Sequence, residues 1–232
     1  MAITAIVTDI EGTTTPISFV AEVLFPYARA HLAAFLRDHA EDPAVRESLD
    51  AARALAGKPE LDIAGVTELL IQWIDEDRKA TPLKDLQGLI WADGYVAGAF
   101  QGDLYPDVLP ALIQWRESSR RLYIYSSGSV ASQRLLFGHS IHGDLIPLFS
   151  GYFDTRIGPK IETDSYRRIA AEIGTAPESI LFLSDSEKEL DAARQAGLQT
   201  IRLARDGTVE SSHPIHESFA TICLEFPFNP MT

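Results

Sequence analysis

The sequence predicts an α/β fold, a Rossmann-like doubly wound and mostly parallel sheet with a helical cap domain inserted after the first strand. Three observations predict it. A short apolar segment rich in β-branched residues, residues 3–10, opens the chain and is typical of a buried strand. A long stretch with only helical periodicity follows. From about residue 101, strand-like and helix-like segments alternate, which is typical of parallel strands joined by helices.

The stretch after the first strand looks entirely helical. Between about residues 19 and 98, four amphipathic segments are separated by proline or glycine, and we expect Pro26 to bend the first of them. A single strand is too short to form a domain, so the simplest organisation is one core interrupted by an insert. We therefore expect a discontinuous core of residues 1–17 and 101–232, and a helical cap of residues 18–100.

The alternating part supplies the other elements of the core. The tail contains "SFATICLEF", which is a candidate edge strand. The expected strands lie in the segments 121–127, 152–157, 179–185 and 199–204, and the expected helices in 130–140, 163–174 and 187–197.

Composition indicates a globular protein and argues against two classes of partner. The 232 residues are 46% hydrophobic and 23% charged, as in ordinary globular proteins. The net charge of −13 repels phosphate backbones and anionic lipids, so we expect no nucleic-acid partner and no membrane partner. The lone Cys223 cannot form an internal disulfide and suits a reducing compartment. With no signal segment and no stretch approaching a membrane span, we expect a cytoplasmic protein, and in the absence of an assembly motif a monomer.

Polar residues follow the predicted strands at four places. In a parallel sheet these places meet at one edge, where open α/β sheets bind ligands. Singly, each has an ordinary explanation as a helix cap, a surface lysine or a solvated loop. Together, a carboxylate nucleophile, a hydroxyl beside backbone N–H groups, a lysine and a metal-binding acid are what phosphoryl transfer requires. The four places are Asp9 with Glu11, Ser126 with Ser127, Lys160, and Asp185 with Glu187.

Four segments of the chain resemble, in order, the four motifs of the haloacid dehalogenase-like phosphatases. They are "DIEGTT", "YSSGS", "GPKIETDSY" and "LSDSEKELDAA". Most of that superfamily has an aspartate two positions after the nucleophile, whereas this chain has Glu11. The glutamate, together with "LQGLIWADGYVAGAF", more narrowly resembles the enolase-phosphatase, or acireductone synthase, family of methionine salvage. The resemblance runs from the first strand to about Gly197.

The resemblance implies one Mg²⁺ per subunit, held by Asp9, by Glu11 through its backbone carbonyl, and by Asp185. It implies that Asp9 is the nucleophile, that Ser126 and the N–H of Ser127 bind the phosphate, and that Lys160 neutralises charge. The implied reaction converts 2,3-diketo-5-methylthiopentyl-1-phosphate to 1,2-dihydroxy-3-keto-5-methylthiopentene, by enolisation and then dephosphorylation through an aspartyl phosphate. The partner is thus a small phosphorylated molecule.

Several alternatives stay open at this point. Glu11 is either the base of the enolisation or only a backbone ligand and leaving-group acid. The enzyme could be a general magnesium-dependent phosphatase of small metabolites, and a non-enzymatic phospho-acceptor switch uses similar residues in a shorter chain without a cap. Trp91 and Tyr95 lie one helical turn apart, and we favour core packing over contact with the methylthio tail. The histidines show no metal-ligand spacing, and dipole compensation at a helix start explains Glu187.

Overall fold

The computed structural model describes residues 2–76, 78, 80–207 and 210–224. The chain divides into two compact units. One comprises residues 1–17 and 101–232 and contains the sheet; the other comprises residues 18–100 and is helical.

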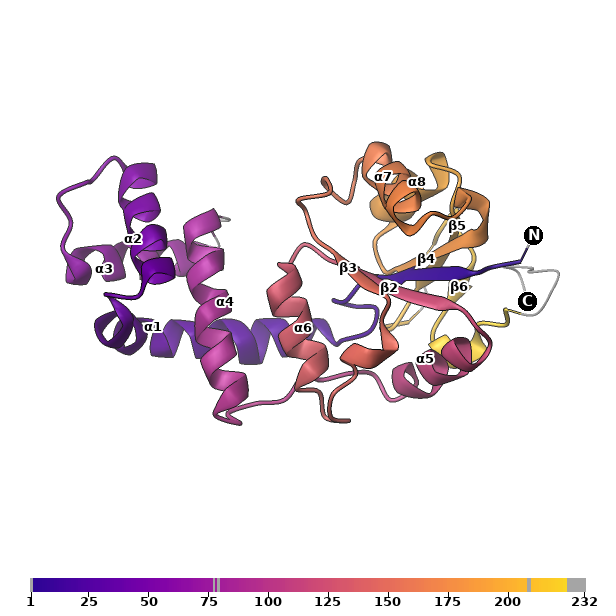
Figure 1. Ribbon diagram of the computed structural model, residues 1–232, viewed down its shortest axis with the longest axis horizontal. Helices are drawn as coiled ribbons and strands as arrows, with labels where there is room; N and C mark the ends of the chain where they lie inside the picture. The colour runs from indigo at the N-terminus through magenta and orange to yellow at the C-terminus, as the bar shows by residue number, and fades with distance from the viewer. Residues whose placement is uncertain (1, 77, 79, 208–209, 225–232) are drawn as a thin grey trace. The chain divides into compact units, whose positions relative to one another are not determined.

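The sheet has six strands, all paired in parallel, in the order β3-β2-β1-β4-β5-β6. The predicted α/β fold with a parallel sheet is therefore confirmed. The first strand of the chain, β1, lies between β2 and β4 in the middle of the sheet (Figure 1). The strands are β1 (Ala5–Thr8), β2 (Arg121–Tyr125), β3 (Gly151–Phe153), β4 (Ile180–Ser184), β5 (Gln199–Leu203) and β6 (Ile215–His216).

Helices cover both faces of this sheet. Figure 1 shows α7 (Thr163–Ile173) and α8 (Glu187–Gln195) on one face and α5 (Val108–Glu117) on the other. Val7 of β1 belongs to the apolar cluster with α7 and α8, whereas its neighbour Ile6 belongs to the cluster with α5. Burial on both faces explains why the central strand is a continuous apolar run. The remaining elements of this unit are α6 (Val130–Gly138) and three single-turn 3-10 helices, η2 (Ile146–Leu148), η3 (Pro177–Ser179) and η4 (Phe219–Thr221).

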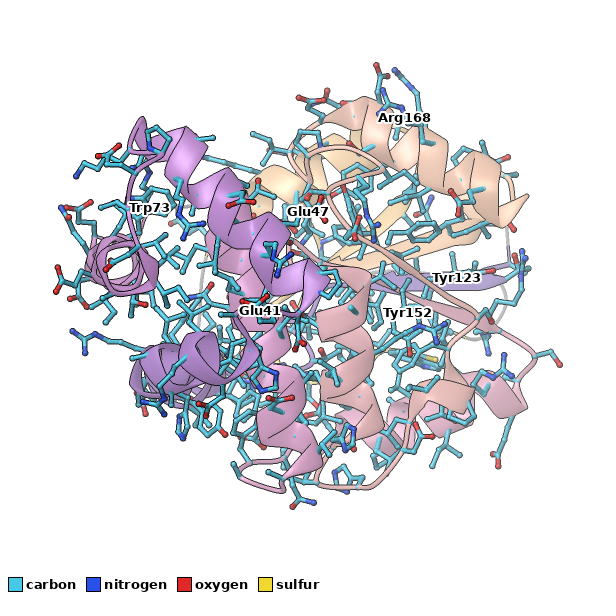
Figure 2. All side chains as sticks on the ribbon, turned by 60° about the vertical axis from the view of Figure 1, so that its left-hand side comes forward. Glu41, Glu47, Trp73, Tyr123, Tyr152 and Arg168 are labelled. Atoms are coloured by element: carbon cyan, nitrogen blue, oxygen red, sulfur yellow. The ribbon has the colours of Figure 1, made fainter. Side chains whose placement is uncertain are left out.

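The helical unit has its own apolar core, to which Trp73, labelled in Figure 2, contributes a fully buried ring. Asp62 begins α3 by accepting a hydrogen bond from the N–H of Gly65 at 2.8 Å. Gly57 ends α2 with a φ of +66°, where glycine carries no steric cost. The elements are the π-helical segment η1 (Phe19–Leu24), α1 (Phe25–His39), α2 (Pro43–Ala56), α3 (Ile63–Asp75) and α4 (Thr81–Val96).

At three elements the structure corrects or adds to what the sequence indicates. Pro26 marks the junction where the π-helical segment becomes α1, at the first turn of an α-helix, where its missing N–H is tolerated. Sequence reasoning passed over α5, whose Pro110 likewise lies in the first turn. The expected edge strand in 218–226 is wrong over its described part, which contains η4, and the strand at this edge is β6; residues 225 and 226 lie outside the described residues.

The expectation that no stretch approaches a membrane span also needs correction. Within the described residues, the 21-residue helical stretch Phe19–His39 is long and apolar enough to qualify by length and composition. The core helix of a soluble protein passes the same test. Ala28, Leu32 and Leu36 of this stretch are buried in the core of the helical unit, which explains its apolar face.

Candidate active site

Asp9 is fixed at the carboxyl end of the central strand by hydrogen bonds to both its backbone and its side chain. Its N–H donates to the carbonyl of Leu183 at 2.9 Å, which continues the pairing of β1 with β4. Oδ1 accepts from the N–H of Ile10 at 2.7 Å and lies 2.6 Å from Nζ of Lys160. Oδ2 accepts a longer hydrogen bond, 3.4 Å, from the hydroxyl of Ser184. The carboxylate is therefore buried, oriented and paired with a cation.

The chain turns sharply after Asp9 and packs against Asp185. The N–H groups of residues 13–15 all donate to the carbonyl of Ile10, at 2.9–3.2 Å. Gly12 has a φ of +67°, and a Cβ added to it would lie 2.4 Å from Oδ2 of Asp185. Glycine is required here both for the backbone conformation and for the close approach to a carboxylate.

Asp185 follows β4 and faces the same region. Its N–H donates to the hydroxyl of Thr13 at 3.1 Å, so the turn after β1 and the end of β4 hold one another. Burial, and after it the negative charge of Asp9, raise the pKa of the Asp185 carboxyl. Two acids in this relation gain from a cation placed between them.

These groups fit a magnesium ion. Asp9 and Asp185 would supply carboxylate oxygens, the kind of donor that Mg²⁺ prefers. Glu11 lies on the turn after Asp9 with an exposed side chain, and its backbone forms an isolated bridge with Thr15.

Lys160 is a buried cation held between two acids. Its Nζ lies 2.6 Å from Asp9 and 2.7 Å from Oε2 of Glu189. Burial alone would lower the pKa of the Lys160 ammonium, but the charges of Asp9 and Glu189 raise it, so the group stays protonated. The hydroxyl of Tyr166 donates to the carbonyl of Lys160 at 2.7 Å, and that of Tyr125 donates to the carbonyl of Gly158 at 2.8 Å. The backbone is therefore fixed at the lysine and two residues before it.

Glu189 is the site residue that sequence reasoning missed. Besides Lys160, it accepts a hydrogen bond from Ser184 at 3.0 Å, and burial followed by the charge of Asp9 raises the pKa of its carboxyl. It lies in the first turn of α8, four positions after Asp185. An acid in the first turn of a helix is explained by the helix dipole alone, so the sequence carried no specific signal for Glu189. Glu187, by contrast, pairs with Arg202 and accepts hydrogen bonds from the 211–212 segment.

Ser126 lies at the same edge of the sheet as Asp9, because β2 pairs with β1 and Ser126 follows β2. It is buried, and its hydroxyl accepts from the N–H of Gly128 at 3.2 Å. Ser127 is exposed, and Ser129 caps α6. Among the described residues, Asp9, Lys160 and Asp185 form one connected cluster, whereas no hydrogen bond links Ser126 or Ser127 to it.

A second group of possible ligands lies apart from this cluster. Glu187, Asp191 and His213 place ligand atoms within 4.8 Å of one another. Arg202 pairs with Glu187 and Arg194 with Asp191, so the two carboxylates already have cationic partners. These contacts attach residues 210–216 to α8. The group could not be recognised in the sequence because His213 lies far along the chain from the two acids.

Comparison with known proteins gives the class of this protein. A family model described as a haloacid dehalogenase-like hydrolase matches residues 3–197. The chain belongs to the haloacid dehalogenase-like hydrolases. Two relatives are named Enolase-phosphatase E1: that of Pseudomonas syringae pv. syringae B728a is 56% identical over 222 residues, covering 96% of this chain and 98% of the relative. That of Methylococcus capsulatus is 57% identical over 211 residues, covering 91% and 93%.

A solved structure supports the same assignment. The UTR4 protein of Saccharomyces cerevisiae superimposes with a TM-score of 0.79 at 32% identity, covering 94% of this chain and 99% of that one. The predicted resemblance to the haloacid dehalogenase-like hydrolases, and within them to the enolase-phosphatases, is confirmed. The alternative of a non-enzymatic switch is wrong, because the family is one of hydrolases.

Proposed function

We propose that this protein is an enolase-phosphatase that converts 2,3-diketo-5-methylthiopentyl-1-phosphate to the acireductone 1,2-dihydroxy-3-keto-5-methylthiopentene and phosphate in methionine salvage. The observation that carries the proposal is the cluster of Asp9 and Lys160, which are buried, with Glu189 and Asp185, which are partly buried, at the end of β1. It occurs in a chain more than half identical to proteins named for both reactions.

Asp9, Asp185 and the backbone carbonyl of Glu11 would hold one Mg²⁺ per subunit. When bound, the ion supplies positive charge against the substrate phosphate and polarises a carbonyl oxygen. The protein's own positive charge at this place is Lys160, which stays protonated between two acids. The negative net charge of the whole chain makes such local compensation necessary for an anionic substrate.

Asp9 performs the phosphatase step as a nucleophile. A carboxylate oxygen of Asp9 attacks phosphorus, the bond from phosphorus to the ester oxygen breaks, and an aspartyl phosphate forms. Water then attacks this phosphorus and releases phosphate, which restores Asp9. Lys160, the hydroxyl of Ser126 and the N–H of Ser127 stabilise the charge on the transferring group.

Glu11 performs the proton transfer of the enolase step. The substrate carbon that bears the phosphate lies next to a carbonyl, so its C–H proton is acidified. The exposed carboxylate of Glu11 lies on the turn between Asp9 and Gly12, one methylene farther from the backbone than an aspartate would be. It removes this proton, and in its protonated form it can later return a proton to the leaving oxygen.

The helical unit, residues 18–100, serves as the cap that excludes water during both steps. The insert begins at Ser18, nine residues after Asp9, and Tyr95 and Trp91 pack inside it. We place the enzyme in the cytoplasm as a monomer. Light scattering of the purified protein tests the monomer, and fractionation of cells tests the location.

The function is tested by following enol absorbance and free phosphate together, with purified protein, the diketo phosphate and either Mg²⁺ or a chelator. We expect both products with Mg²⁺ and neither with chelator. Glu11→Gln keeps the shape of the side chain but removes the base, so we expect it to lose enol formation. Glu117→Gln, an exposed glutamate at the end of α5, is the matched control and should behave as the parent. Enol formation by Glu11→Gln at the parent rate would restrict Glu11 to the phosphatase step.

A further inference from the structure

Arg205, just after β5, donates hydrogen bonds to a backbone carbonyl of the turn that follows Asp9. Its Nε and Nη2 both donate to the carbonyl of Thr13, at 3.0 and 2.7 Å. The side chain is only 5% exposed. Hydrogen bonds from a buried charged donor are among the stronger ones in proteins. Arg205 therefore restrains the turn that links Asp9 to the cap insertion.

Thr13 passes this restraint to the end of β4. The residue is fully buried, and its hydroxyl accepts the N–H of Asp185 at 3.1 Å. The carbonyl and the hydroxyl of one threonine thus join Arg205 on one side and Asp185 on the other. A displacement of Thr13 would move the backbone of Asp185 and the turn after Asp9, and both belong to the candidate metal site.

Arg205 is itself rigidly held. Nη1 lies 2.9 and 2.8 Å from the two carboxylate oxygens of Asp107, and one of these oxygens also accepts the N–H of Phe219 at 2.6 Å. The guanidinium carbon lies 4.2 Å from the ring centroid of Tyr105 and 5.1 Å from that of Phe219. With its acid partner and two aromatic faces, the guanidinium is an anchored support rather than a mobile surface group.

We propose that Arg205 is a positioning residue that holds the turn after Asp9, through Thr13, in the geometry that binds the metal ion. The inference rests on the proposed function for its metal, and it adds a residue outside the four motifs. The N–H of Tyr105 donates to the carbonyl of Thr14 at 3.0 Å, which gives the same turn a second tie to the segment before α5. Partners that orient metal ligands are worth about 10- to 100-fold in metal affinity.

The test compares Arg205→Met and Arg205→Lys with a matched control, Arg121→Met. Arg121 also binds a backbone carbonyl, that of Ile173, at 2.9 Å, and it contacts Thr175, but it lies at the start of β2, at the opposite edge of the sheet. Three properties are measured on each protein without substrate: Mg²⁺ affinity by calorimetry, amide exchange of the peptide containing residues 13–15, and thermal unfolding.

We expect Arg205→Met to lower Mg²⁺ affinity by about tenfold and to speed exchange in residues 13–15, with Arg205→Lys in between. Arg121→Met should lower the Tm and leave both other properties as in the parent. Thr13→Val should weaken Mg²⁺ binding in a way that is not additive with Arg205→Met, because both act along one path. If Arg205→Met does not fold, Arg205→Lys alone carries the test.

Two results would overturn the inference. One is a folded Arg205 variant whose Mg²⁺ affinity and exchange match those of the parent. The other is an Arg121→Met variant that loses as much Mg²⁺ affinity as Arg205→Met, since that would reduce the effect to general destabilisation. None of these readouts requires turnover. A parent protein that binds Mg²⁺ but does not convert the diketo phosphate would therefore refute the proposed function and leave the role of Arg205 standing.

Discussion

At the scale of single residues, the chemistry depends most on the carboxylate of Asp9. We predict that Asp9→Asn abolishes phosphate release while the fold remains intact. The amide is nearly isosteric and can still accept from Ile10, and Lys160 keeps Glu189 as an acid partner, but an amide is a poor nucleophile and a weak metal ligand. Phosphate release and circular dichroism measure the two halves of this prediction. Substantial residual turnover would assign the nucleophile to another group.

The sequence could predict those residues of the site that directly follow a strand, because the ends of parallel strands meet at one edge of the sheet. Asp9 and Asp185 each follow a strand, so a parallel sheet alone places them at one edge. Glu189 depends on how α8 packs, which residue order does not reveal. Arg205 was harder to find, because its partner is the carbonyl of Thr13, and every residue type offers a carbonyl. The surroundings of the predicted nucleophile therefore required coordinates.

At the scale of elements, the turn between β1 and the helical insert is sensitive to a single methyl group. We predict that Gly12→Ala weakens Mg²⁺ binding and turnover as well as stability. A Cβ there would lie 2.4 Å from the Asp185 carboxylate, and a φ of +67° costs a non-glycine residue about 1–2 kcal/mol. Calorimetric Mg²⁺ titration and urea unfolding measure the two effects.

Gly174→Ala is the matched control for this turn. Gly174 also has a φ of +66°, but a Cβ there meets nothing within 4 Å, so the variant carries the backbone strain without the clash. It should lose only the stability that the backbone strain costs, and it should keep its Mg²⁺ affinity. Equal Mg²⁺ affinities in the two alanine variants would show that the close approach of Gly12 to Asp185 has no role in binding.

Helices were predictable from the sequence where the apolar pattern continued over several turns and proline or glycine marked its ends. The helix α2 lies within the segment expected from apolar spacing and proline or glycine boundaries, and α3 and α4 overlap theirs but begin two residues earlier. The short helix α5 was passed over because Pro110 is ambiguous from sequence, although in a first turn it breaks no hydrogen bond. The strand β6 has only two residues, too few to show any alternation.

At the scale of the whole molecule, the packing of the 210–216 segment against α8 makes stability depend on pH. His213 contacts Thr200 of β5 and Asp191 of α8, with Glu187 and Arg194 nearby. Burial, and after it the charge of Arg194, lower the pKa of the His213 imidazole below its ordinary value of 6.5. The unfolded chain therefore binds this proton first as the pH falls.

We predict that the free energy of unfolding decreases as the pH falls from above 6.5 toward the lowered pKa of His213. His213→Gln, which cannot gain the proton, should reduce this slope, as measured by urea unfolding at several pH values. Glu187 acts in a separate, more acidic range: burial would raise the pKa of its carboxyl, but hydrogen bonds from Ser211 and Ser212 lower it to about 2. Equal slopes for the parent and His213→Gln between pH 5 and 7 would contradict the prediction.

The central position of β1 has a consequence for how the chain is made. Ala5 pairs with Arg121 on one side and with Ile180 on the other, so β1 is synthesised well before either of its partner strands. Closing such distant pairings is slow. The helical unit, whose core is complete by residue 100, can condense in the interval and shorten the flexible chain between the partners. Until then an apolar strand stays unpaired in the nascent chain, and unpaired strands of this kind are one reason why chaperones exist.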